Sequence, residues 1–340
     1  MSNAVYMDAN ATTPPSAAAL TALEAAARVT GNPSSVHGFG RAARAVVDRA
    51  RVQVARLVGA KAENVIFVAG GTEANNLALA SRGGRPLIVS GIEHESVLKP
   101  AQAAGARVLK IRRNGQVDLD DLADALRETV QPAFVSIMLA NNETGVIQPV
   151  REAAEVVHAA GGLLHCDASQ TPGRIVLDMS ALGADLLSLS AHKMGGVLGT
   201  GAVVLNSDLP IAPMLIGGGQ EKYRRAGTEN VPAIAAFGAA AEEARTLAHA
   251  PRVQTLRDRL EAQLAGLGIE VLGKNAPRLP NTACVAVPGK SSETLVMALD
   301  LAGYAISAGS ACSSGKVKPS PVALAMGYGE EIAKSAIRIS

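Results

Sequence analysis

Short apolar runs alternate with amphipathic stretches through the middle of the chain. The runs that predict buried strands lie at residues 64–70, 85–91, 132–140, 161–169, 184–191 and 200–206. Stretches rich in Ala, Leu and Glu with helical spacing separate most of them, for example residues 71–82, 118–130 and 149–161. Continuous apolar strands joined by helices predict a mostly parallel sheet that is buried on both faces, which is an α/β fold.

The pattern changes near residue 245. A charged helix is predicted over residues 251–268. The strands predicted after it lie at 269–273, 281–288 and 304–309. A single hydrophobic core stops growing below 340 residues, so two units are expected. We predict a large domain over residues 15–245 and a smaller α+β domain formed by residues 1–14 and 246–340.

Composition and charge narrow the class of protein. Hydrophobic residues make up 48% of the chain and charged residues 18%, which indicates a globular protein and excludes a mainly disordered one. The 32 basic and 30 acidic residues are interspersed, so neither a nucleic-acid nor a membrane partner is expected. The N-terminus has no leader-like pattern and no apolar run reaches membrane-spanning length, so we expect a cytoplasmic protein.

Polar residues follow the ends of several predicted strands, where ligands bind in open α/β sheets. These residues are Gly71, Thr72, Glu73, Glu93, His94, Asn141, Asn142, Glu143, Asp167, Gln170, His192 and Lys193. Taken singly, each has an ordinary structural interpretation. Lys193 alone would be a solvated charge, Asp167 a helix cap and Gly71 part of a turn.

Their conjunction favours one cofactor. A Gly-Thr turn at a helix N-terminus binds phosphate through backbone N–H groups. An aspartate at a strand end holds a protonated ring nitrogen, and a shielded lysine forms a Schiff base. Pyridoxal phosphate requires these three groups of the protein that binds it: a phosphate site, an acidic partner for its ring nitrogen and a lysine amine. Neither a P-loop nor a dinucleotide glycine pattern competes with this interpretation.

The motifs resemble those of the cysteine desulfurase family, in the class V aminotransferase group of fold type I pyridoxal-phosphate enzymes. The segments that carry the resemblance read GNPSSVHGFGRAAR, GGTEANNLAL, EHESVL, NNETG, HCDASQ, SLSAHK, GGGQEKYRRAGTEN and SAGSACSSG. The resemblance runs over essentially the whole chain. It implies an aspartate aminotransferase-like large domain with a seven-stranded-type sheet that binds the cofactor, and a small domain that carries a catalytic cysteine loop.

The resemblance also implies a role for individual residues. Lys193 would form the Schiff base, Asp167 would contact the pyridine nitrogen, His94 would stack on the ring and Gln170 would bind the phenolic oxygen. The phosphate would be bound by Gly71, Thr72, Ser190, His192 and, from the other subunit of a homodimer, Thr228. The substrate carboxylate would be held by Asn142 and Arg338. After Lys193 the family commonly continues with a Gly-Pro-Lys-Gly-like turn, whereas this chain has Val197 and Leu198 there.

The three cysteines have different surroundings. Cys166 alternates with Asp167 along a strand and Cys284 lies in an apolar run, so both are predicted to be core thiols. Serines and glycines surround Cys312, which favours a solvent-reaching nucleophile over a structural loop cysteine. The spacing of the cysteines is not that of a zinc site, and no resident metal is expected.

With the resemblance, Cys312 becomes the residue that takes sulfur from L-cysteine as a persulfide, leaving L-alanine. The sulfur would pass to an acceptor or iron–sulfur scaffold protein, where Cys312 would contact a nascent cluster. The alternatives are a selenocysteine lyase or another aminotransferase-like enzyme of fold type I, and a catalytically inactive relative that serves as a binding subunit. Cys312 separates the first reaction from an aminotransferase, which needs no such thiol.

Overall fold

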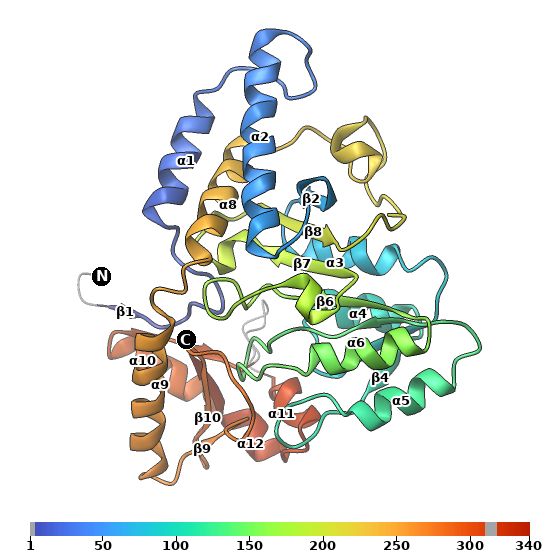
Figure 1. Cartoon of the computed structure of the whole chain (residues 1–340). Helices are drawn as coiled ribbons and strands as arrows, with labels where there is room; N and C mark the ends of the chain where they lie inside the picture. The colour runs from blue at the N-terminus through green and yellow to red at the C-terminus, as the bar shows by residue number, and fades with distance from the viewer. Residues whose placement is uncertain (1–3, 310–317) are drawn as a thin grey trace.

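A seven-stranded sheet lies at the centre of the computed structural model, which describes residues 4–309 and 318–340 (Figure 1). Its strands are β2 (Val65–Val68), β3 (Leu87–Ser90), β4 (Arg107–Leu109), β5 (Phe134–Ser136), β6 (Leu163–Asp167), β7 (Leu186–Ser190) and β8 (Gly201–Leu205). They are arranged in the order β2-β8-β7-β6-β5-β3-β4. Only β8 runs antiparallel to its neighbours within this sheet. The predicted α/β class with a mostly parallel sheet is confirmed.

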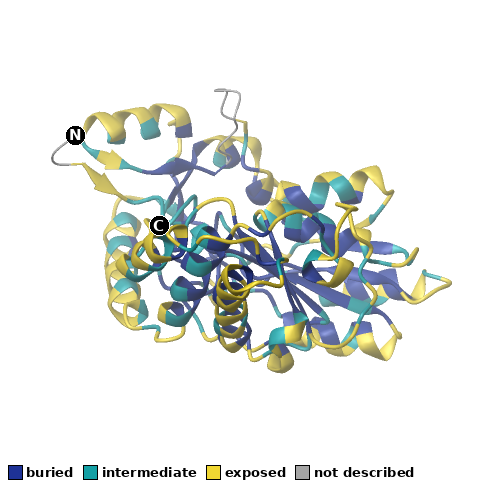
Figure 2. Cartoon of the chain, turned by 90° about the horizontal axis from the view of Figure 1, so that it is seen from above, coloured by how far each residue is buried: buried dark blue, intermediate teal, exposed yellow. Residues whose placement is uncertain are grey.

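Helices cover both faces of this sheet and leave its strands as the most buried part of the molecule (Figure 2). One face packs against α1 (Ala17–Ala27), α2 (Gly38–Leu57), α5 (Leu119–Arg127), α6 (Val150–Ala159) and α8 (Val231–Ala244). The other packs against α3 (Gly71–Ala80) and α4 (Glu95–Ala103). Alternation along β2 shows the cause, because Val65 and Phe67 enter the first core whereas Ile66 and Val68 enter the second.

A second, antiparallel sheet forms the core of the C-terminal region. Its strands are β9 (Glu270–Val271), β10 (Ala283–Ala286), β12 (Ser307–Ala308) and β13 (Ala336–Ile339), in the order β12-β13-β10-β9. The helices around it are α9 (Ala250–Ala265), α10 (Ser292–Leu301), α11 (Pro321–Ala325) and α12 (Glu330–Ser335). Val285 and Ile337 face one side, and Cys284 and Ala286 face the other. This arrangement matches the α+β character predicted for the C-terminal region.

The N-terminal arm touches both parts of the molecule. Strand β1 (Val5–Tyr6) pairs in parallel with β11 (Tyr304–Ala305) of the C-terminal region. A few residues later the Thr13 N–H donates to the backbone carbonyl of His192, 2.8 Å away, beside the large sheet. The bounds of 15–245 for the large domain, and of 1–14 with 246–340 for the small one, remain predictions.

Strand β4 is the element of the large sheet that hydrophobic patterning does not show. It is three residues long, lies at the sheet edge and exposes Arg107 and Val108, so it lacks the continuous apolar run of the inner strands.

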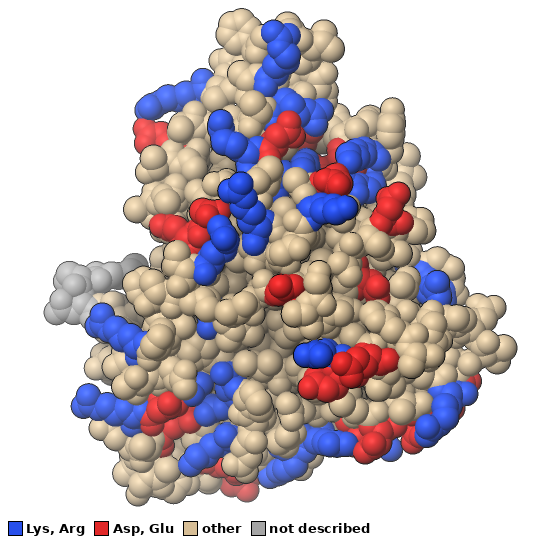
Figure 3. Space-filling model, viewed as in Figure 1, with Lys and Arg blue, Asp and Glu red and all other residues tan. Residues whose placement is uncertain are grey.

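Among the described helices, none is both long and apolar enough to cross a membrane. On the face drawn in Figure 3, basic and acidic side chains lie side by side.

Candidate active site

The carboxyl ends of β6 and β7 bring Asp167 and Lys193 to one edge of the large sheet. Asp167 ends β6, and the neighbouring parallel strand β7 leads into a single 3₁₀ turn at Ala191–Lys193. Asp167 is buried; its Oδ1 accepts from the Ser169 N–H at 2.9 Å and its Oδ2 from Asn75 Nδ2 at 2.7 Å. Each carboxylate oxygen has a further lone pair. The carboxylate is therefore held at a fixed orientation while it can still accept from a ring N–H.

The amine of Lys193 lies in surroundings that favour its neutral form. Nζ donates to the backbone carbonyls of Asn10 at 2.6 Å and Ala11 at 2.8 Å. Burial is the main cause that lowers the pKa of Lys193 to about 8, and the positive charges of Arg338 and Arg174 add to it. A lysine with such a pKa supplies the neutral amine that attack on a carbonyl carbon requires.

The start of α3 lies against β7 and forms a cradle. Among the residues that the structure describes, no side chain caps the helix N-terminus at Gly71. A Cβ added to Gly71 would come within 3.3 Å of Ser190 Cβ and 3.4 Å of Ser169 Oγ, so glycine permits this close approach. Uncapped backbone N–H groups, the helix dipole and two serine hydroxyls form a set that fits a phosphate group. Thr72 follows Gly71 and is exposed.

Gln170 and His192 lie at the same edge and both contact the N-terminal arm. Gln170 is buried and its Nε2 donates to the Asn10 carbonyl at 3.1 Å. His192 Nδ1 lies 3.1 Å from Thr12 Oγ1. Burial, followed by the charge of Lys193, lowers the pKa of His192 to about 4, so this ring is neutral near pH 7.

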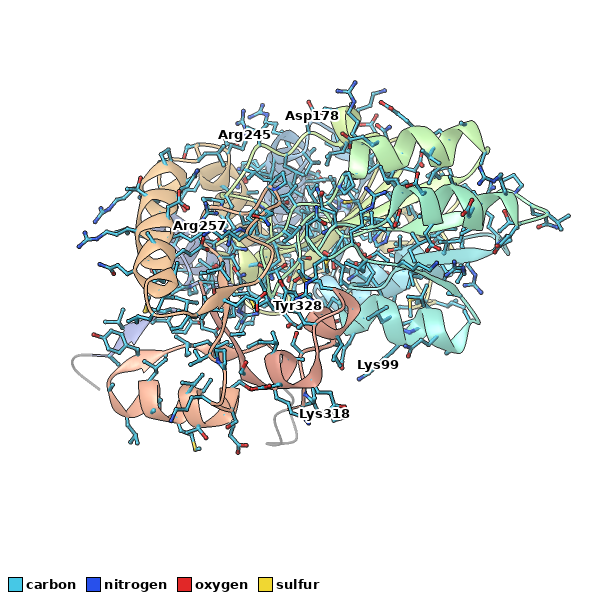
Figure 4. The ribbon with its side chains drawn as sticks, turned by 90° about the horizontal axis from the view of Figure 1, so that it is seen from below. Lys99, Asp178, Arg245, Arg257, Lys318 and Tyr328 are labelled. Carbon is cyan, nitrogen blue, oxygen red and sulfur yellow. The ribbon has the colours of Figure 1, made fainter. Side chains whose placement is uncertain are left out.

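His94 caps helix α4. Its Nδ1 accepts from the Ser96 N–H at 3.1 Å and lies 2.7 Å from Ser96 Oγ, while the residue stays exposed. Lys99 lowers the pKa of Glu95 in the same helix, and Lys318 of the C-terminal region contributes to this shift. Figure 4 shows Lys99 and Lys318 on the same side of the molecule. The start of helix α4 therefore lies within electrostatic reach of Lys318 in the C-terminal region.

The small sheet, which is the antiparallel sheet of the C-terminal region, contributes Arg338 from β13. It is buried, and its guanidinium bonds Asp8 Oδ1 at 2.6 Å and the backbone carbonyl of Asn142 at 3.0 Å. Its Nε is buried and has no hydrogen-bond partner among the described residues. The structure therefore brings Arg338 and Asn142 together, with one guanidinium donor left over.

Comparison with known proteins agrees with this geometry. The model of the aminotransferase class-V family matches residues 5–340. A cysteine desulfurase of Cereibacter sphaeroides is 42% identical, with 99% of this chain and 90% of that protein covered. Cysteine desulfurase IscS of Dictyoglomus turgidum is 38% identical, over 100% of this chain and 90% of the relative. A NifS-like protein from Rickettsia africae superposes with a TM-score of 0.93 at 34% identity, covering 99% and 93% of the two chains.

The chain belongs to the cysteine desulfurase family. It therefore has the fold of that family, as the motifs indicated. The departure of this chain from the family turn after Lys193 is accommodated locally. Gly195 and Gly199 have φ values of 87° and 84°, Val197 packs against the core and Leu198 is exposed. The turn is built by glycines in the left-handed conformation.

Asn10, in the N-terminal arm, belongs to the site but was not among the residues predicted from the sequence. Its carbonyl accepts from Lys193 and Gln170, and its Nδ2 donates to the Asn142 carbonyl at 3.1 Å and to Thr282 Oγ1 at 3.0 Å. The sequence feature that could have indicated Asn10 is the polar segment DANATT, residues 8–13. Asn10 joins the two sides of the site.

The cysteines fall into two groups. Cys166 and Cys284 are fully buried, and burial raises the pKa of Cys284 above its usual range and that of Cys166 well above it. Both are core thiols, as predicted. Cys312 lies outside the described residues, so its role stays a prediction.

Thr228 is exposed and lies on the loop after β8, away from the contacts described for the other site residues of this chain. Glu221 anchors this loop to the large domain: its carboxylate pairs with both terminal nitrogens of Arg51 at 2.7 Å and accepts from the Phe67 N–H at 3.2 Å. Glu221 has a φ of 46°, a left-handed conformation that is unfavourable for a non-glycine residue. The bidentate pair offsets that cost and fixes the course of the loop.

Proposed function

We propose that this protein is a pyridoxal-phosphate-dependent cysteine desulfurase, which converts L-cysteine to L-alanine and leaves the sulfur as a persulfide on Cys312. One observation carries the proposal: Asp167, Lys193 and the uncapped start of α3 meet at one edge of the sheet. Curated relatives at up to 42% identity are cysteine desulfurases, which supports the choice among enzymes that use this cofactor.

The residues at the sheet edge fit pyridoxal phosphate. The N-terminus of α3 with Ser190 would take the phosphate, Asp167 the ring nitrogen and Lys193 the aldehyde. Gln170 would bind the phenolic oxygen and His94 would cover the ring face. When bound, the cofactor supplies an electron sink for charge that develops at the α-carbon of the substrate.

The side chains of the protein perform the remaining work. Arg338 and Asn142 hold the substrate carboxylate, which orients the α-carbon. Lys193, with a pKa of about 8, accepts the α-proton as a neutral amine and releases it again. Burial and its two hydrogen bonds keep the Asp167 carboxylate directed at the ring N–H.

Sulfur transfer then needs a thiolate. Cys312 attacks the sulfur of the substrate, so an S–S bond forms while the carbon–sulfur bond breaks. The electron pair of the broken bond stays with the three-carbon product, which takes up a proton and becomes alanine. Atoms and electrons balance without an external oxidant. The persulfide is handed to an acceptor protein for iron–sulfur cluster assembly or other thio-cofactor synthesis.

The homodimer and the compartment are part of the proposal. Ile216 and Tyr223, on the loop that bears Thr228, are 89% and 74% exposed, as a subunit interface requires. Glu229, which follows Thr228 in the chain, is buried, yet both its carboxylate oxygens lack partners among the described residues. Thr228 would then reach the phosphate in the other subunit. The reduced buried thiols Cys166 and Cys284 agree with a cytoplasmic protein.

The test is an assay of alanine and sulfide formation from L-cysteine with wild type, Cys312→Ala and the matched control Cys284→Ala. We expect Cys312→Ala to lose sulfide release at least about 100-fold, because the attacking thiol is gone. Cys284→Ala removes a core thiol and should keep kcat within about twofold. Full-rate alanine formation by Cys312→Ala would rule out the persulfide mechanism.

Two further measurements separate the alternatives. A selenocysteine lyase would turn over L-selenocysteine in Cys312→Ala at the wild-type rate while wild type leaves L-cysteine unchanged. A binding subunit without catalysis would show no cofactor absorbance in the visible range after pyridoxal phosphate is added.

A further inference from the structure

A chain of hydrogen bonds connects Asp167 to His94 through the buried side chains of Asn75 and Ser96. Asn75, in the second turn of α3, is 1% exposed. Its Nδ2 lies 2.7 Å from Asp167 Oδ2 and 2.9 Å from Ser96 Oγ. Ser96 Oγ in turn lies 2.7 Å from His94 Nδ1. Strand β6 and the starts of α3 and α4 are thereby joined through side chains alone.

Donor and acceptor roles in this chain are determined by chemistry. A carboxylate only accepts, so the amide of Asn75 must direct Nδ2 toward Asp167, and its second Nδ2 hydrogen goes to Ser96. Ser96 Oγ already accepts that hydrogen, which directs its own hydrogen to His94 Nδ1. The Ser96 N–H donates to the same nitrogen at 3.1 Å. His94 Nδ1 is thus an acceptor twice, and the neutral ring carries its proton on Nε2.

Packing alone does not explain why an amide is buried at Asn75. Its Oδ1 is buried and has no partner among the described residues. A buried acceptor without a hydrogen bond loses its hydration and gains nothing in return, and an apolar side chain of the same volume would avoid that loss. The compensating gain lies in the two bonds that Nδ2 makes.

We propose that Asn75 is a positioning residue, which couples the carboxylate of Asp167 to the imidazole of His94 through Ser96 and so, together with the Ser96 N–H, keeps His94 Nδ1 an acceptor. The inference rests on the proposed function, because it gives Asp167 and His94 their places around one bound cofactor. Asn75 itself touches neither substrate nor cofactor. Its effect is to hold a ring-nitrogen partner and a ring-stacking imidazole in one frame, with the Nε2–H of His94 available to the site.

The test compares Asn75→Leu, Ser96→Ala, the double variant and the control Asn76→Ala. Asn76 is adjacent on the same helix and donates to the backbone carbonyls of Thr72 and Ser96, not to Asp167 or His94. The readouts on the holoenzyme are the ¹⁵N shifts of labelled histidines, the dissociation constant of pyridoxal phosphate, and kcat and KM for L-cysteine.

Asn75→Leu should lower kcat about 10-fold with KM within about twofold, because misplacement of reacting groups costs rate more than binding. Its cofactor dissociation constant should rise several-fold, since Asp167 loses a bond. Ser96→Ala removes one of the two hydrogen bonds that His94 Nδ1 accepts and keeps the backbone N–H donor, so the ¹⁵N shift of His94 Nδ1 should change while the cofactor constant stays unchanged. The kcat of the double variant should lie within about twofold of that of Asn75→Leu, because both substitutions interrupt the same chain of hydrogen bonds.

Additive effects of the two substitutions, or an Asn75→Leu enzyme whose His94 shifts equal those of wild type, would overturn the proposal. If Asn75→Leu does not fold, Ser96→Ala decides it alone, since unchanged His94 shifts would exclude the relay. Failure of wild type to act on L-cysteine would refute the proposed function instead. The nitrogen shifts and the cofactor constant would then still report on the relay.

Discussion

The edge of the large sheet and strand β13 of the small sheet contribute to the site in different ways. At the large sheet, adjacent strand ends supply Asp167 and Lys193, and nearby backbone and side-chain groups hold each of them. The small sheet supplies Arg338, which depends on Asp8 and Asn142 from other parts of the chain for its orientation.

This difference predicts two kinds of loss. In the proposed function, the groups at the large sheet act on the bonds that form and break, so their removal should lower kcat. In the same proposal, Arg338 offers charge and donors to a substrate carboxylate that does not change in the reaction, so its removal should raise KM. The N-terminal arm, which contacts both regions, should affect both through stability.

The largest effect is expected for Lys193→Arg. A guanidinium keeps the positive charge but never becomes a neutral amine, so kcat for L-cysteine should fall at least about 10³-fold. Steady-state alanine production measures it, with Lys99→Arg on the surface of α4 as control. A rate within tenfold of wild type would mean that the lysine is not the reacting group.

Arg338→Gln should have the next largest effect. A hydrogen bond to a charged partner contributes about 1.5 to 3 kcal/mol, so kcat/KM for L-cysteine should fall roughly 10- to 100-fold, mostly through KM. The control is Arg278→Gln, because the side chain of Arg278 is as buried as that of Arg338 and pairs with Glu261 at 2.6 Å elsewhere in the C-terminal region. That control should lower Tm and leave KM unchanged. A fall in kcat alone for Arg338→Gln would contradict the division between the two regions.

Hydrophobic periodicity predicted the inner strands because each is a continuous apolar run buried on both faces. The rule that ligands bind at strand ends then located Asp167 and Lys193 before any contact was known. What patterning did not reveal are partners that meet across long separations. Asn75 and Asp167 are 92 residues apart, and Asn10 and Thr282 are 272 apart. An asparagine in a helix or an arm shows no partner in sequence, since its value depends on which acceptor the fold brings near.

Asn10→Ala tests the link between the two regions. The change removes the buried donor to Thr282 Oγ1 and one of the two donors to the Asn142 carbonyl, which Arg338 still bonds, so the free energy of unfolding should fall by about 2 kcal/mol. Denaturant unfolding measures it, and Asn206→Ala at an exposed turn is the control. Because the arm also accepts from Lys193, kcat and KM should both worsen by a few-fold. A change in kcat without a change in KM, or the reverse, would show that the arm supports only one of the two regions.

The smallest effect concerns the carboxyl group of Glu143, where the two regions touch. Glu143 follows β5, accepts from Ser320 Oγ at 2.5 Å and lies where a Cβ on Gly309 would come within 2.8 Å of its Oε2. Burial raises the pKa of Glu143 from 4.5 to about 7, against the lowering effects of Ser320 and Arg338. The native state therefore holds this proton more tightly than the unfolded chain does.

The sign of the pH effect follows from that difference. Between about pH 4.5 and pH 7 the native state binds more protons at Glu143, so this group makes stability fall as pH rises. The amide side chain of the Glu143→Gln variant stays neutral at every pH and can still accept from Ser320. Relative to wild type, the variant should gain on the order of 1 kcal/mol in unfolding free energy from pH 5 to pH 8. Parallel stability curves for the two proteins would show that the pKa of Glu143 does not differ between the native and the unfolded state.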